Sequence, residues 1–495
     1  VAISIEQVAE PFGRLIADNK YGRRRINTES VMKFNIAKWS IGVLTVCTLS
    51  ACAQFGKQAP LEEPTAYSLS EGKSAVMAKD AWWLQLHDKK LNLLIAQAIQ
   101  TSPDLRVAKA RFDQAQAQLG LTEAATKTQI GFSVRGAGAY VSPKPTSRQG
   151  ETDNTLLLAN AALQGSWEFD FWGKNRNQIA SVLGKRQAIL YEARQTRIML
   201  ANAVAAQYFA WQSLEEQQKL LARRTETADR TLQLMQRRVR AKLMPPESLY
   251  QIELLQHRLQ LERLSLEQQT AKVRNSLSAL TGNAPYTLPV RFPEEMASVP
   301  NLPADRIYAD LLAARPDIAV QKSLLESKYH AIKSTEAEFY PNIELKVLAG
   351  MAHIDAFNVI HGRNSAMLGI LPALNLPIFT SGALQSKLWG RRAEYNEQVA
   401  IYDRTVLNAM RSAANAVVDY QSLQAKKLVW DKMLNTSGKS VRAVQNRVKV
   451  GLENGLGVLQ KQEEGLQLQM QAVQYQAEYL TAWSNLHAQL GGGVK

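Results

Sequence analysis

Cysteines, aromatic residues and metal-ligand clusters are scarce in this chain. Its 495 residues include two cysteines and six histidines, and 7% are aromatic. Two cysteines cannot build a disulfide scaffold and the histidines have no metal-ligand spacing, so we expect neither a disulfide framework nor a metal site. No phosphate-binding loop and no nucleophile elbow occurs. We therefore predict that the chain is not an enzyme and that it holds no dissociable cofactor.

Long apolar runs are missing as well. From residue 52 onward, no apolar run reaches the roughly 18 residues that suggest a transmembrane helix, so any membrane-spanning segment is expected to be β-structure. The formal charge of +15 is not gathered in a dense basic patch. Its closest pairs, such as Arg223-Arg224 and Arg237-Arg238, fit the solvated faces of a coiled coil. We therefore expect no nucleic-acid partner.

A short apolar stretch near the N-terminus, residues 39–48, has the surroundings of an export signal. Lys33 and Lys38 precede it, and residues 49–52 (LSAC) follow it. A basic region before an apolar stretch is typical of signal peptides, and small residues before a cysteine match the lipobox of bacterial lipoproteins. We predict a lipoprotein signal peptide at 32–51. A short buried helix with an incidental cysteine is the alternative.

The same interpretation covers the residues on either side of the signal. Residues 1–31 are expected to be an upstream extension that is untranslated or removed, with Met32 as the start. Cys52 is expected to carry an N-acyl chain and S-diacylglycerol. Ala53, in place of an aspartate, favours sorting to the outer membrane. Residues 52–80 are polar and interrupted by prolines, so we predict a lipidated tether.

Two long segments, from about 173 to 282 and from about 382 to 491, are predicted to be helical. In the first, apolar residues recur at every seventh position in two series: Leu214, Leu221, Ala228 and Met235, then Ile252, Leu259, Leu266, Val273 and Leu280. This is the period of a coiled coil. A helix from residue 173 to the Pro245-Pro246 break would be about 100 Å long at ~1.5 Å per residue. Such a rod spans a distance and encloses no pocket.

The two halves of the chain match each other. A shift of 213 residues pairs TEA at 122–124 with TEA at 335–337, and a shift of 209 residues pairs Gly173 with Gly382. The four-residue difference falls where loop length is least constrained. We predict an internal duplication, and its parts are a first repeat at 81–282, a proline-rich linker at 283–304 and a second repeat at 305–493.

Between the helices of each half, the apolar period changes to two. Ile130, Phe132 and Val134 alternate with polar or small residues, which gives one apolar face and one polar face. Strands are predicted at about 128–141, 155–171, 341–352 and 366–379. Such strands fit a transmembrane barrel, and a soluble sheet packed on the helices is the alternative. Because membrane strands cannot leave edges unpaired and four strands cannot close a barrel, several chains are expected to donate four strands each.

Several short motifs resemble those of a known family. They are WW at 82–83, SWEFDFWG at 166–173, RPDI at 315–318, FYP at 339–341 and LPIF at 376–379. On these motifs the chain resembles the outer-membrane channel proteins of bacterial tripartite efflux systems, the TolC-like superfamily. Within it, the chain is most similar to the NodT or OprM-like lipoprotein branch.

The resemblance implies a mainly α fold with a transmembrane β part. A homotrimer would close a twelve-stranded barrel in the Gram-negative outer membrane and a twelve-helix coiled-coil tunnel in the periplasm. The implied partners are a periplasmic membrane-fusion adaptor, an inner-membrane RND or MFS transporter, and outer-membrane lipid. The implied function is passive conduction of drugs or other small molecules to the exterior. A type I protein secretion channel and a non-conducting structural coiled-coil lipoprotein are the alternatives.

The resemblance also assigns adaptor contacts to the two helix tips, near residues 242–248 and 451–457. The tip residues are Lys242, Leu243, Pro245, Pro246, Gly451, Leu452, Glu453 and Gly455. Prolines and glycines break helices, so turns are expected there on physical grounds too.

Family members often carry aspartates just after the second tip, where they form a constriction of the tunnel. This chain has Gly457 and Gln460 at the matching positions. Glu453, together with these two residues, is the candidate constriction here. Glu463 and Glu464 are further candidates for the missing carboxylates.

Overall fold

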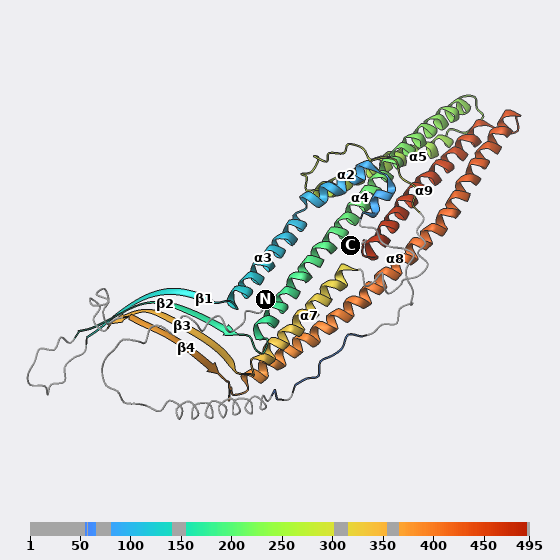
Figure 1. The fold of residues 1–495 in the computed structure, drawn as a ribbon. Helices are drawn as coiled ribbons and strands as arrows, with labels where there is room; N and C mark the ends of the chain where they lie inside the picture. Colours follow the sequence, from blue (N-terminus) through green and yellow to red (C-terminus); the bar gives the residue numbers. More distant parts are fainter. Residues whose placement is uncertain are drawn as a thin grey trace, which may run out of the picture. The chain divides into compact units, whose positions relative to one another are not determined.

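Helices make up most of the structure, and a four-stranded antiparallel sheet connects their ends (Figure 1). The computed structural model describes residues 55–56, 58–65, 81–140, 155–300, 315–353 and 366–492, which all belong to one unit that begins at Phe55. The expected upstream extension, the signal peptide and Cys52 lie outside the described residues.

The two halves of the chain have the same order of long elements: a helix, two strands and a pair of long helices. In the first half these are α3 (Pro103–Ala125), β1 (Gln129–Tyr140), β2 (Thr155–Phe169), α4 (Lys174–Arg240) and α5 (Ser248–Leu280), preceded by η3 (Trp82–Leu86) and α2 (Lys89–Thr101). In the second half they are α7 (Pro316–Ala337), β3 (Asn342–His353), β4 (Ala366–Asn375), α8 (Ala383–Lys449) and α9 (Gly455–Gln489).

The helices α4 and α8 begin in the same way and have the same length. Each follows a glycine in the left-handed region, Gly173 with φ 80° and Gly382 with φ 83°. Glycine adopts this conformation without the steric cost that a Cβ brings, so the chain can turn sharply from strand into helix. Each helix has 67 residues, or about 100 Å, which confirms the predicted rod.

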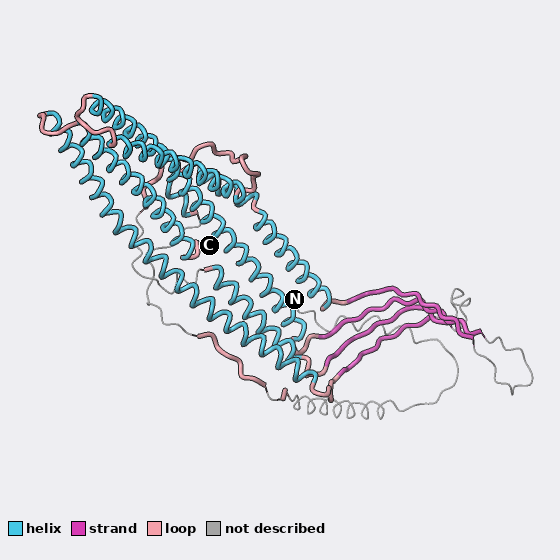
Figure 2. The backbone as a smooth tube through the Cα atoms, turned by 180° about the vertical axis from the view of Figure 1, so that it is seen from behind, coloured by secondary structure: helices cyan, strands magenta, loops and turns pink. Residues whose placement is uncertain are grey.

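The seven-residue series packs as predicted. Leu214, Leu221 and Ala228 of α4 form one buried cluster with Ile252, Leu259 and Leu266 of α5, and Leu466 and Met470 of α9 complete it. A larger cluster joins η3 and α2 to the middle of α4 and the C-terminal part of α9, with Trp82, Trp211 and Trp483 almost fully buried in it. Figure 2 shows these helices running side by side. The buried stripes therefore fix which helix faces which.

The sheet has the order β1-β2-β3-β4, and its register places apolar residues on one face. One row across all four strands is Phe132, Leu163, Ala349 and Leu368, and the next is Ile130, Gly165, Val347 and Ile370. This face is uncovered: Phe132 is 69% and Leu368 is 80% exposed. The alternating pattern thus predicted the faces correctly, and the interpretation as a sheet packed on the helices is wrong for this face.

The opposite face of the sheet is polar. One row carries Gln129, Ser166 and Lys346, and another carries Glu168 opposite Glu344. The two carboxylates are each paired with a lysine, Glu168 with Lys174 at 2.6 Å and Glu344 with Lys346 at 3.2 Å. These pairs offset the repulsion that like charges directly opposite each other would cause.

One strand is shorter than the sequence pattern predicts. β4 ends at Asn375, although alternation continues to about residue 379. β3 begins at Asn342, opposite Asn375, so the residues after 375 have no neighbouring strand in this chain. The strand ends there because backbone groups without a partner gain nothing from the extended ladder.

The described part of the tether lies along α8. Phe55 packs on Phe339 with ring centroids 4.9 Å apart, next to the start of β3. Further along, the Glu62 amide donates to Asn396 Oδ1 at 3.0 Å, and the Thr65 hydroxyl donates to Asp403 Oδ2 at 2.6 Å. The tether therefore runs from the strand–helix junction towards the middle of α8.

Candidate functional site

The first helix tip is closed by a Schellman motif. At the end of α4, the Leu243 amide donates to the Arg238 carbonyl at 2.8 Å and the Lys242 amide donates to the Val239 carbonyl at 3.0 Å. Lys242 adopts the left-handed conformation, with φ 57°. This arrangement satisfies carbonyls that the helix end would leave unpaired. Pro245 and Pro246 follow, both exposed, and α5 begins at Ser248.

The second tip repeats the motif. The Leu452 amide donates to the Arg447 carbonyl at 2.9 Å, and the Gly451 amide donates to the Val448 carbonyl at 3.1 Å. Gly451, with φ 74°, takes the place that Lys242 has in the first tip. The two tips are close together, because a Cβ on Gly455 would lie 3.4 Å from Leu234 Cδ2. The predicted turns are confirmed, and the start of α9 packs against the last two turns of α4.

Both tips present an exposed leucine directly after the left-handed residue. Leu243 is 67% and Leu452 is 76% exposed, and Val450 beside them is 69% exposed. Large apolar side chains gathered at one end of a structure mark a surface for a partner. The tips therefore carry exposed apolar side chains at positions where the resemblance predicts contacts with a partner.

The structure brings two of the three candidate constriction residues together. The Glu453 side chain bends over the start of α9, where a Cβ on Gly457 would lie 3.2 Å from Glu453 Oε1. Arg447 Nε lies 4.0 Å from Glu453 Oε2. A carboxylate at a helix N-terminus is stabilised by the helix dipole. Gln460 lies apart from this pair and donates to Glu464 Oε1 at 3.3 Å.

The further candidate Glu463 has a different role. It is held by Arg224, whose Nε donates to Glu463 Oε1 at 2.8 Å and whose Nη1 donates to Glu262 Oε2 at 3.0 Å. Arg224 is only 7% exposed, so its placement on a solvated helix face was wrong. The guanidinium ties α4, α5 and α9 together, and Glu463 is not available as a free carboxylate.

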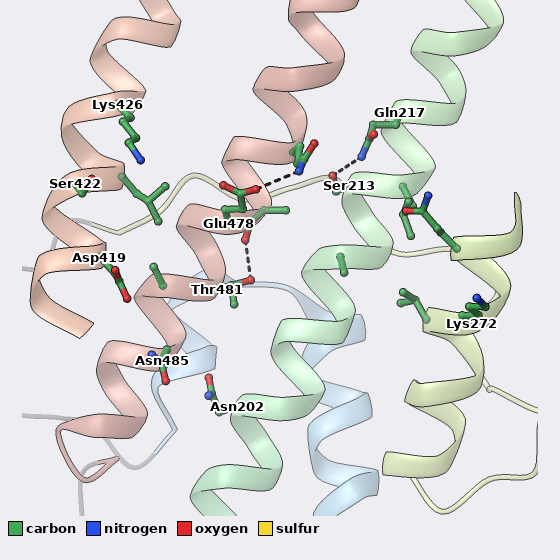
Figure 3. A pocket seen from close by; sticks show the side chains of 18 residues that line it. Asn202, Ser213, Gln217, Lys272, Asp419, Ser422, Lys426, Glu478, Thr481 and Asn485 are labelled. Atoms are coloured by element: carbon green, nitrogen blue, oxygen red, sulfur yellow. Dashed lines mark hydrogen bonds between the residues drawn. The ribbon is translucent and has the colours of Figure 1, made fainter. Parts of the chain in front are cut away.

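A polar groove runs between α4, α5, α8 and α9 (Figure 3). It has a volume of about 950 Å³ and is lined by hydroxyl, amide and charged side chains together with apolar ones such as Leu214, Val273 and Leu423. The charged residues are Lys272, Asp419, Lys426 and Glu478, two of each sign. Amides and hydroxyls hydrogen-bond water well. This face of the helices is therefore suited to contact with water and with polar solutes.

A different side of the bundle is covered by the described part of the linker. The Glu294 amide donates to Tyr208 Oη at 2.9 Å, and Tyr208 Oη donates to Asp88 Oδ1 at 3.1 Å. Burial, reinforced by the Asp88 carboxylate, raises the pKa of Tyr208 far above its ordinary value. The phenol therefore stays protonated and joins the linker to the cap of α2. The sequence held no signal for this junction, because its members lie far apart in the chain.

Two other kinds of site are absent from the described residues. None of the helices there is both long and apolar enough to span a membrane. No group of three or more histidine, cysteine, aspartate or glutamate side chains in those parts is placed to hold a metal ion.

Known proteins are similar to this chain in sequence and in architecture. The family model for outer membrane efflux proteins matches residues 94–283 and 307–492. MdtQ of Escherichia coli K12 is 30% identical over 431 residues, which cover 84% of this chain and 88% of MdtQ. In E. coli O157:H7, MdtQ is described as a multidrug resistance outer membrane protein and is 29% identical.

Solved structures agree with these relatives. VceC, an outer membrane protein of Vibrio cholerae, has a TM-score of 0.74 and 26% identity, and the match covers 84% of this chain and all of VceC. The outer membrane channel CmeC of Campylobacter jejuni has a TM-score of 0.76 and covers 88% of this chain and 94% of CmeC, and its 20% identity supports the fold alone. The resemblance seen in the motifs is thereby confirmed, and the chain belongs to the outer membrane efflux protein family.

Proposed function

We propose that this protein is the outer-membrane channel of a tripartite efflux pump and that it conducts drugs or other small molecules passively to the cell exterior. The observation that carries the proposal is the combination in one chain of a sheet that has one apolar and one polar face with helices about 100 Å long that border a groove with many polar side chains. The multidrug resistance relatives MdtQ and MdtP support the cargo class.

A homotrimer completes the proposed conduit. Twelve strands, four from each of three chains, would form a barrel with its apolar face towards lipid and its polar face towards water. The packing of side chains on the polar face supports curvature of the sheet towards that face. A Cβ on Gly350 would lie 2.6 Å from the Ala162 Cα, and Ala162 is fully buried. Both residues are on the polar face, which is therefore crowded here, as the inner face of a barrel is.

Exposed apolar side chains on α5 and α8 also support a trimer. Leu254, Leu261 and Leu264 on α5 are 49% to 68% exposed, and Val418 and Leu428 on α8 are 62% and 63% exposed. Leu254, Leu261 and Leu264 have coiled-coil spacing. An exposed stripe of this kind calls for a helix from another copy, and the proposed tunnel of twelve helices would provide it.

The lipid anchor fits the described part of the tether. Cys52 itself lies outside the described residues, but Phe55, three positions later, packs on Phe339. Phe339 lies at the strand–helix junction, where the proposed barrel leaves the membrane. A diacylglycerol on Cys52 would be within reach of the periplasmic leaflet, and a lipid chain together with the barrel gives stable attachment. The duplication is supported by the matching order of elements in the two halves.

The proposed partners meet the protein at the tips. We assign Leu243 and Leu452 as contacts for a periplasmic membrane-fusion adaptor, and an inner-membrane RND or MFS transporter supplies the energy. Glu453 over Gly457 is the proposed constriction. The test is photo-crosslinking from Leu243 and Leu452 in living cells. Capture of an adaptor and its transporter supports the pump, whereas capture of peptidoglycan alone contradicts it.

Conduction needs its own experiment, because it separates the alternatives. The purified protein is added to planar bilayers, and the same gene is deleted and restored in its host. Stable conductance together with increased drug sensitivity of the deletion strain is expected. No conductance would favour a structural lipoprotein. Conductance with unchanged drug sensitivity and loss of one secreted protein would favour type I secretion.

A further inference from the structure

A second cavity lies on the side of the bundle that the linker covers. It has a volume of about 790 Å³ and is bounded by α4, α8, α9 and residues 292–296 of the linker. No described residue lines both this cavity and the polar groove. Pockets for small molecules have volumes of roughly 300 to 1,000 Å³ and often form between the helices of a bundle. The cavity is therefore large enough for a small organic molecule.

Acidic side chains outnumber basic ones in the lining of this cavity. Five carboxylates and two cationic groups of the described residues line it. The acidic residues are Glu215, Glu216, Glu294, Glu295 and Asp431, and the basic residues are Lys219 and Arg223. Opposite charges attract and like charges repel over such short distances. A cationic ligand is therefore favoured over an anionic one.

Two of these carboxylates have no cation of their own. Glu216 is paired with Lys219 at 3.0 Å, and two of the other acidic residues are paired with lysines outside the cavity. In the part of the chain that the structure describes, Glu215 on α4 and Glu295 on the linker form no ion pair. Glu215 accepts only a hydrogen bond from Trp211 Nε1 there, at 2.8 Å. Both carboxylates therefore have lone pairs left for a cation.

Lys219 shows that an ammonium group is held beside these carboxylates. The hydrogen bond with Glu216, together with the charges of Glu295 and Glu215, raises the pKa of Lys219. The three carboxylates, from α4 and from the linker, therefore lie near one ammonium group. The Lys219 side chain is 65% exposed, so it extends into solvent and does not fill the cavity.

A buried amide at the cavity also lacks a partner. Gln212 lines the cavity and is only 4% exposed. Its Nε2 donates to the Glu294 carbonyl at 3.0 Å and to Asp88 Oδ2 at 3.2 Å. Its Oε1 has no hydrogen-bond partner among the described residues. Because Nε2 already bonds to acceptors, the unpaired atom is the acceptor of the amide, and it calls for a donor such as an ammonium group.

The rest of the lining is apolar apart from two glutamines. The apolar side chains include Leu220, Phe292, Met296, Leu434 and Val473. The Phe292 ring is 55% exposed, and the Arg291 guanidinium lies 5.4 Å from its centroid. A bare metal ion does not fit, because no three carboxylates or histidines in the described parts of the chain are placed to hold one. A hydrocarbon body would cover the apolar side chains favourably.

We propose that this cavity binds an amphipathic amine, a small organic molecule with a primary ammonium group and an apolar body. The ammonium group lies between Glu215 and Glu295 and donates to Gln212 Oε1. The apolar body packs on Phe292 and Val473. The bound molecule contacts the linker, α4 and α9 together, so it holds the linker on the bundle. The proposed channel is not required for this site, since the cavity and the polar groove have separate linings.

Calorimetric titration of the purified full chain in a non-ionic detergent tests the site. The probes are phenylbutylamine and phenylbutanol, which have the same apolar body and differ in the charged group. The amine is expected to bind about tenfold more tightly than the alcohol, because its ammonium group forms charge-assisted hydrogen bonds. In the double variant Glu215→Gln with Glu295→Gln, the affinity for the amine is expected to fall about tenfold, since an exposed ion pair contributes up to about fivefold.

The matched control removes the same charge from exposed positions outside the cavity, in the double variant Glu226→Gln with Glu253→Gln. Its affinity for the amine is expected to be unchanged. Lys219→Met removes the competing ammonium group and is expected to tighten binding about threefold. Equal binding of the amine and the alcohol overturns the proposal. An unchanged affinity in the cavity variant, or an equal loss in the control variant, overturns it as well.

Hydrogen exchange tests the contact with the linker. Amides of residues 294–296 are expected to exchange about tenfold more slowly when phenylbutylamine is bound, because the bound molecule keeps this segment on α4 and α9. Phenylbutanol at the same concentration is the control and is expected to leave these rates unchanged. Amine binding with unchanged exchange of residues 294–296 would place the amine elsewhere and overturn the site.

Discussion

The buried guanidinium of Arg224 offers a sharp test of how the helix tips are held. In Arg224→Ala, Glu463 loses its cation although its side chain is only 18% exposed. Removing one partner of a buried ion pair costs about 3 to 5 kcal/mol. The lower value applies here, because the second carboxylate, Glu262, is 38% exposed and rehydrates. A loss of ~3 kcal/mol corresponds to about a 150-fold change in an equilibrium constant.

Hydrogen exchange measures this loss where it occurs. Amides of α9 around Glu463 open locally, and their exchange is expected to be about 100-fold faster in Arg224→Ala than in the unchanged protein. Arg223→Ala is the matched control, because Arg223 is exposed and its removal is expected to change little. Arg224→Leu combined with Glu463→Leu should restore slow exchange, since apolar residues can replace a buried ion pair. Equal exchange in the Arg224 and Arg223 variants would refute the reasoning.

Four further predictions concern other parts of the chain. Phe132→Asp should reduce membrane assembly far more than Ser133→Asp, because a charge on the proposed lipid face costs up to roughly 2 to 4 kcal/mol; equal yields of the two variants in membranes would contradict the face assignment. Tyr208→Phe should cost about 1 to 3 kcal/mol by leaving Asp88 short of a donor, measured as faster proteolysis of the linker, and unchanged proteolysis would contradict it. Leu452→Asp should abolish crosslinking to the proposed adaptor without changing the oligomeric state. Cys52→Ser should remove the lipid seen by mass spectrometry and leave trimers in the outer membrane, and their complete loss from it would show that the barrel alone does not anchor them.

The helices and strands follow from local patterns that the sequence displays openly. The period of seven through Ile252, Leu259 and Leu266 predicts a buried stripe, and that stripe is buried. The period of two through Ile130 and Phe132 predicts an apolar face, and that face is exposed. Both patterns are short-range, because each residue's neighbours within one turn or one strand define its face.

The features that were missed depend on contacts between distant segments. Arg224 looks like any basic residue of a coiled coil until α9, more than 200 positions later, brings Glu463 beside it. The junction of Tyr208 with Asp88 and Glu294 is of the same kind. The end of β4 was misplaced because alternation continues through residues that lack a neighbouring strand in the single chain. Periodicity shows which face is buried, but not which segment buries it.

Because α4 and α8 have equal length, they span the same distance from their strand–helix junctions to the two tips. Each helix has 67 residues, and the tips meet where Gly455 approaches Leu234. Inserting one heptad into the first hairpin alone would carry its tip about 10 Å past the other. A partner that contacts both tips would then lose its contact with one of them. An insertion matched by one of equal length in the second hairpin would keep the two tips level.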